Sequence, residues 1–194
     1  MEWARVSPSL SADERREAVR LAGEIGWHDR AVFSLTSGED LQHYALRFPL
    51  SYGRTLRAEG KQYGLDPAWM AALIRAESAW MPDARSAADA RGLMQLLPGT
   101  GAEVARKLGL PWTGGDSLYR PITNLKLGSA YLAAMRDRFD GHVALATAAY
   151  NAGPTPVLRW RNQRPLDPID VWIETIPYFE TREYVARILA FSVI

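Results

Sequence analysis

The sequence contains no cysteine, only three histidines and no long apolar run. Its 194 residues therefore hold no disulfide, no thiolate nucleophile and no cysteine-ligated zinc site. His28, His43 and His142 lack the spacing of metal ligands, which argues against a metal site. The first thirty residues are charged, and no eighteen apolar residues run together. We therefore expect neither a signal peptide nor a transmembrane helix in this sequence.

An excess of one charge is also lacking. The 23 Lys and Arg residues nearly balance the 22 Asp and Glu residues, which leaves a net charge of +1. Nucleic acids and anionic membranes are bound by clustered cations, so neither partner is expected. With 47% apolar and 23% charged residues, the chain is typical of one moderate globular domain, or of one domain plus a fragment.

Alternating apolar and polar runs between hairpin turns, the usual sign of β-strands, are missing as well. Segments of helical periodicity with short Gly and Pro breaks fill the chain instead, and they predict an all-α fold. The expected helices cover about residues 11–25, 29–36, 49–63, 66–81, 98–108, 124–139, 144–150 and 181–191.

The helix expected over residues 66–81 carries the most informative acid. Asp66 can cap its free amides and Pro67 suits its first position, while Pro82 removes a backbone donor and should end it near Met81. Other expected helix ends are marked in the same way, by Ser11 and Glu14 as a capping box and by Thr100 as a cap.

Glu77 lies on the last turn of this helix, three and four residues beyond Ile74 and Leu73 of its apolar stripe. A carboxyl group facing inward loses hydration of its charged form, so its pKa rises towards the range of a general acid at neutral pH. Alternatively, Glu77 lies at the edge of the stripe and forms a structural ion pair with Arg75 or another base.

Residues 77–82 (ESAWMP), Ala84, Ser86, 92–95 (GLMQ) and 98–100 (PGT) resemble the active-site signature of lytic transglycosylases with a goose-type-lysozyme-like domain. Residues 149–154 (AYNAGP) resemble the second motif of that family, and residues 176–182 (IPYFETR) resemble a third motif of the soluble lytic transglycosylases. Asp89 departs from the pattern, because the family often has glycine there. This change should alter the shape and charge at the edge of the site.

The resemblance also suggests how the chain is divided. Residues 46–50 resemble the start of the catalytic domain, so we predict a lysozyme-like catalytic domain over 46–194. Residues 1–45 resemble the end of the α-superhelix that precedes it in that family, which would make this chain part of a longer protein. Alternatively, the two amphipathic helices within 1–45 simply cover the catalytic domain.

The family resemblance implies an enzyme of the periplasm, expected to be a monomer, that cleaves the β-1,4 bond between N-acetylmuramic acid and N-acetylglucosamine in peptidoglycan. It needs no cofactor or metal and forms a 1,6-anhydromuramoyl product. Glu77 would act as acid and then as base. A lysozyme-type hydrolase and a non-catalytic peptidoglycan-binding domain are the alternatives. The expected substrate-binding residues are Ser78, Ser86, Met94, Gln95, Tyr150, Asn151, Tyr178 and Glu180.

Glu180 and the aromatic candidates each have a second interpretation. Glu180 either orients the substrate and tunes the site or is an acid favourably placed at a helix N-terminus. Aromatic side chains can stack on sugar rings or simply fill the core. The aromatic candidates are Tyr119, Trp160, Trp172 and Tyr178.

Overall fold

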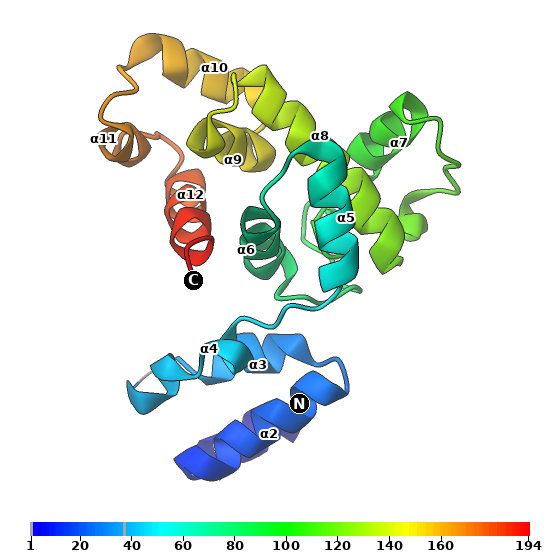
Figure 1. The fold of residues 1–194 in the computed structure, drawn as a ribbon. Coiled ribbons are helices and arrows are strands. Elements are labelled where there is room, and N and C mark those ends of the chain that lie inside the picture. The colour runs from blue at the N-terminus through cyan, green and yellow to red at the C-terminus, as the bar shows by residue number, and fades with distance from the viewer. Residues whose placement is uncertain (1, 37) are drawn as a thin grey trace.

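Helices make up almost all of the regular structure in this computed structural model, which describes residues 2–36 and 38–194 (Figure 1). Within those ranges no β-sheet forms, and strand-like pairing is limited to isolated bridges from Arg91 to Arg85 and to Leu96. The all-α prediction is confirmed. The α-helices are α1 Glu2–Val6, α2 Ala12–Glu24, α3 His28–Ser34, α4 Tyr44–Arg47, α5 Gly53–Tyr63, α6 Pro67–Ser78, α7 Pro98–Lys107, α8 Pro121–Arg138, α9 Val143–Ala152, α10 Pro154–Gln163, α11 Ile169–Glu174 and α12 Phe179–Phe191.

Helices α2, α3 and α4 pack together as a segment at the bottom of Figure 1. The predicted capping box opens α2, because the Ser11 side chain accepts from the Glu14 amide and the Glu14 carboxylate accepts from the Ser11 amide. Val19 and Leu35 form a small core there that is separate from the main one. The domain boundary near residue 45 remains a prediction.

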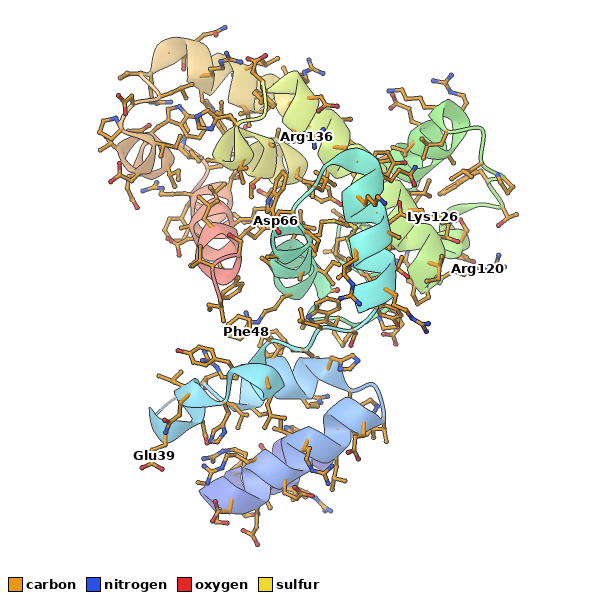
Figure 2. The ribbon with its side chains drawn as sticks, in the orientation of Figure 1. Glu39, Phe48, Asp66, Arg120, Lys126 and Arg136 are labelled. Carbon is orange, nitrogen blue, oxygen red and sulfur yellow. The ribbon has the colours of Figure 1, made fainter. Side chains whose placement is uncertain are left out.

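Phe48 lies where this segment meets the rest of the molecule (Figure 2). The Arg75 guanidinium on α6 lies over the rings of Phe48 and Phe191, 4.5 and 4.0 Å from their centroids, and its Nε donates to the Arg47 carbonyl at 3.2 Å. Such cation–π contacts, made at a partly desolvated site, connect the N-terminal segment to α6 and α12.

Helix α6 starts as predicted, since the Asp66 carboxylate accepts from the Ala68 amide at 2.8 Å and Pro67 takes the first position. Its apolar stripe of Met70, Leu73 and Ile74 is fully buried. The helix is therefore held in place by its core-facing side, with propensity and capping fixing where it begins.

The predicted end of α6 at Met81 is wrong, because the helix stops at Ser78. Ala79 and Trp80 adopt left-handed backbone angles, with φ of 49° and 67°. This turn directs Trp80 into the core, where it is 1% exposed. Burying an indole stabilises the fold by about 2–3 kcal/mol, which is comparable to the total cost of about 2–4 kcal/mol for the two left-handed residues.

Three further details differ from the sequence prediction. Helix α5 begins at Gly53 rather than residue 49, because Tyr52 has a left-handed φ of 59° and interrupts the chain before it. Leu97, rather than Thr100, is the residue before α7, and Thr100 lies inside that helix. Helices α10 and α11 were missed, because their short segments carry several prolines and weak periodicity.

Helix α8 supports the turn formed by residues 92–95. Asn124 is fully buried, its Oδ1 accepts from the Met94 amide at 2.7 Å, and its Nδ2 donates to the carbonyls of Arg91 and Leu118 at 2.9 Å. One turn further along α8, Gly128 leaves the space that the Met94 side chain occupies.

We therefore expect Gly128→Ala to destabilise the fold by about 1–3 kcal/mol. A Cβ at Gly128 would lie 2.4 Å from the Met94 sulfur and 2.8 Å from its Cβ, so the turn itself must move. Gly99→Ala in α7 is the control, since an added Cβ meets nothing within 4 Å there. Urea unfolding should show a loss for the first variant only, and equal stabilities would contradict the packing described.

Candidate active site

Helices α6, α9 and α12 meet in the middle of the larger part of the molecule, where α12 packs against both of the others (Figure 1). Glu77 comes from α6 and is only partly exposed. The Tyr184 hydroxyl on α12 donates a hydrogen bond to Glu77 Oε1 at 2.5 Å. This bond joins residues 107 positions apart, so the environment of the acid depends on the tertiary fold.

Burial raises the pKa of Glu77 to about 7, and this loss of hydration is the largest effect. The Tyr184 hydrogen bond lowers the pKa, and the negative charge of Glu180 raises it further. A carboxyl group with such a pKa can release and take up a proton near neutral pH. Arg75 contacts Arg47, Phe48 and Phe191 instead, so the structure supports the inward acid rather than an ion pair with Arg75.

Tyr184 and Tyr150 are both buried, and burial followed by the charge of Glu77 raises the pKa of each hydroxyl well above its ordinary value. Both therefore remain protonated donors at neutral pH. The Tyr150 hydroxyl donates to the Met94 carbonyl at 2.8 Å, and its ring packs 5.2 Å from that of Tyr131.

Ser78 and Met94 lie inside the protein. The Ser78 hydroxyl contacts the Leu93 carbonyl at 2.8 Å and the Ile74 carbonyl at 3.1 Å. Met94 is fully buried against Gly128. In this conformation both side chains fix the position of the turn 92–95 beside Glu77, and neither is exposed to solvent.

Gln95 and Asn151 are partly exposed polar residues. Gln95 Nε2 donates to the carbonyls of Ala84 and Gly92 at 3.1 and 2.9 Å, so its Oε1 is the group that can accept from a ligand. Asn151 Oδ1 accepts from the Thr181 hydroxyl at 2.6 Å, so its amide nitrogen is the group that can donate.

The remaining predicted site residues differ in exposure. Tyr178 is 53% exposed, and its ring meets the buried Trp160 at 5.0 Å in an edge arrangement. Glu180 is exposed on the first turn of α12. Ser86 accepts from the Ala90 amide at 3.0 Å and so shapes the preceding loop. Trp160 and Trp172 are core residues, and the partly exposed Tyr119 packs beside the Arg91 guanidinium, so Tyr178 is the most accessible stacking surface among the four aromatic candidates.

The sequence did not identify Tyr184 as a partner of Glu77. Tyr184 lies among apolar residues of the helix expected over 181–191, and only its polar hydroxyl distinguishes it from a core residue. A cavity of about 410 Å³ is lined by Arg75, Phe48 and Phe191, and Glu77 does not line it.

Within the described residues, no group of three His, Asp or Glu side chains is placed to hold a metal ion.

The family model described as "Transglycosylase SLT domain" matches residues 54–173. The chain belongs to this family. This chain is 34% identical to the soluble lytic murein transglycosylase of Salmonella typhimurium over 98% of this chain and 30% of that protein, and 33% identical to that of Escherichia coli over the same shares. The chain thus spans less than a third of the length of these relatives.

Solved structures agree with this assignment. An inactive mutant of the lytic transglycosylase Slt from Pseudomonas aeruginosa is 41% identical, with a TM-score of 0.90 over 99% of this chain and 31% of that one. The 70 kDa soluble lytic transglycosylase of Escherichia coli is 32% identical, with a TM-score of 0.86 over 98% of this chain and 31% of that one. The predicted lysozyme-like helical fold class is confirmed. None of the helices in the described ranges has the length and apolar character needed to cross a membrane.

The burial of Glu77 predicts a pH-dependent effect of Glu77→Gln on stability. Because the folded pKa is raised from 4.5 to about 7, ionised Glu77 costs stability progressively between these pH values and fully above pH 7. The free energy of unfolding of the variant relative to wild type should therefore be higher at pH 8 than at pH 4, by at most about 3 kcal/mol given the partial exposure.

Urea unfolding at pH 4 and pH 8 would measure this difference in the free energy of unfolding. Glu103→Gln provides the control. Lys107 lowers the pKa of the Glu103 carboxyl, so this substitution should change stability with pH in the opposite direction and only slightly. An effect of Glu77→Gln that is equal at both pH values would show that Glu77 titrates as an ordinary exposed acid.

Tyr184→Phe should raise the pKa of Glu77 above about 7, because it removes the hydrogen bond that favours the carboxylate. Carbon-13 NMR titration of the Glu77 carboxyl would measure this change. Tyr131→Phe, which alters a neighbouring ring that contacts Tyr150, should leave the value close to that of the wild type. A lower pKa in Tyr184→Phe would rule out the role given to this bond.

Proposed function

We propose that the SLT domain cleaves the β-1,4 bond between N-acetylmuramic acid and N-acetylglucosamine in peptidoglycan and forms a 1,6-anhydromuramoyl end. The observation that carries the proposal is the inward-facing carboxyl of Glu77, with a pKa of about 7 and a tyrosine donor. The names of the relatives, soluble lytic murein transglycosylases, support the same substrate. Peptidoglycan then also suggests the periplasm as the location.

Glu77 acts twice in this mechanism. It first gives its proton to the bridging oxygen as the bond to the anomeric carbon breaks, and it becomes a carboxylate. The muramoyl 6-hydroxyl then bonds to the anomeric carbon and returns its proton to Glu77. The substrate acetamido oxygen stabilises the positive charge at the anomeric carbon between these steps, and no water is consumed.

Most glycosidases use a second carboxylate as nucleophile or base. Glu180 is the other acid near Glu77, and its charge raises the pKa of Glu77, but it is exposed and lies on the first turn of α12. We assign it to orienting substrate and to raising the pKa of Glu77. The 6-hydroxyl and acetamido groups of the substrate take the place of a second carboxylate.

The neighbouring residues would hold the glycan. Gln95 and Asn151 offer an acceptor and a donor to the acetamido groups, and Tyr178 offers a flat apolar face to a sugar ring. Ser78, Met94 and Tyr150 would act indirectly, because they fix the turn that carries Gln95.

Glu77→Gln should lower the turnover of peptidoglycan by at least about 10²–10⁴-fold, because it removes the proton that both steps need. Its amide can still accept from Tyr184, so the fold and glycan binding should persist. Glu180→Gln is the comparison, and its loss should be much smaller because no proton transfer is assigned to it. Equal loss in both variants would indicate a two-carboxylate mechanism.

The reaction product distinguishes transglycosylation from its main alternative. Digestion of purified sacculi followed by mass spectrometry should give muramoyl ends one water lighter than the reducing ends that a lysozyme-type hydrolase leaves. Reducing ends would establish hydrolysis. Bound sacculi without any product would indicate a non-catalytic peptidoglycan-binding domain.

A further inference from the structure

An ion-pair network lies on the loop just before the turn 92–95. Arg91 binds the Asp89 carboxylate through two hydrogen bonds, from Nε to Oδ1 and from Nη2 to Oδ2, both at 3.0 Å. Its Nη1 donates to Asp116 Oδ1 at 2.6 Å. Arg85 Nε also reaches Asp89 Oδ1, at 2.6 Å. The guanidinium of Arg91 is thus held between two carboxylates from separate parts of the chain.

The backbone of Arg91 closes the turn that follows. Its N–H donates to the Leu96 carbonyl at 2.9 Å, and the Leu96 N–H donates back to the Arg91 carbonyl at 3.2 Å. The Arg91 carbonyl also accepts from Asn124 Nδ2. Residues 92–95 lie between these two positions, so fixing Arg91 fixes the base of the turn that presents Gln95.

Asp89 has a left-handed backbone, with φ of 66°. Glycine adopts this conformation without steric cost, whereas aspartate tolerates it less readily. Glycine supplies no carboxylate, however, and would leave Arg91 with Asp116 alone. If Asp89 were only a turn-forming residue, asparagine or glycine would serve equally well.

We propose that Asp89 is a positioning residue that, together with Asp116, holds Arg91 and through it keeps the turn 92–95 in the geometry that binds glycan. Asp89 takes part in no proton transfer. The inference rests on the proposed function for the identity of the ligand, whereas the contacts from Asp89 to the turn are independent of it.

Asp89→Asn and Asp89→Gly test this role together. Asparagine keeps the size and the tolerance of a left-handed backbone, and glycine also removes the steric cost, but neither keeps the charge. Both should raise KM for soluble uncross-linked glycan strands by about two- to fivefold, as expected for a partly exposed ion pair, with kcat nearly unchanged. Raising the salt concentration to about 0.5 M should bring the wild-type KM closer to that of the variants, because it screens the pair.

Arg85→Gln is the matched control. It removes one ion pair of Asp89 but leaves Arg91 between Asp89 and Asp116, and its own side chain is 60% exposed. Its KM should equal that of the wild type. An increase in KM as large as that of Asp89→Asn would show that the charge of the loop matters rather than the contact of Asp89 with Arg91. A wild-type KM in Asp89→Gly would show that Asp89 only forms the turn. Either result overturns the inference.

A second measurement separates this inference from the proposed reaction. In a Glu77→Gln background, the two Asp89 variants should bind glycan strands about two- to fivefold more weakly than their parent, and their Leu96 amide should exchange faster with solvent. If the wild type binds glycan but forms no anhydro ends, the proposed reaction fails while this comparison still tests Asp89. Unchanged glycan affinity and amide exchange, or no glycan binding at all, would overturn the role of Asp89.

Discussion

The hydrogen bond from Tyr184 to Glu77 connects the last helix of the chain to the helix that carries the acid. Burial alone would raise the pKa of Glu77 further, and this one donor limits the effect. The acid therefore depends on the packing of α12 against α6, which brings together two segments more than a hundred residues apart. The other buried contacts of the site hold these helices and the neighbouring turn in place.

Side chains from three helices bind the backbone of the turn 92–95. Ser78 contacts the Leu93 carbonyl, while Asn124 and Tyr150 bind the Met94 amide and carbonyl. These partners come from α6, α8 and α9, so three helices share one short segment. Buried polar groups in such a network must all be satisfied, and together they specify a single arrangement of the turn.

Local sequence signals predicted the fold class, the capped start of α6 and the inward position of Glu77, because capping and periodicity act over a few residues. The family resemblance added the turn 92–95 and the polar residues around it. The early end of α6 and the hydrogen bond between Tyr184 and Glu77 could not be predicted from the sequence, since both depend on contacts between distant segments. Trp80 and Tyr184 each look like ordinary core residues until the fold places them.

The end of α6 at Ser78 has an electrostatic consequence for the acid. The carbonyl groups of the last turn of a helix lack helical partners and carry partial negative charge. Since α6 ends at Ser78, Glu77 lies within that last turn, where this field disfavours a carboxylate. The left-handed Ala79 ends α6 directly after this turn, so Glu77 lies near the negative end of the helix dipole, whose effect has the same direction as that of burial.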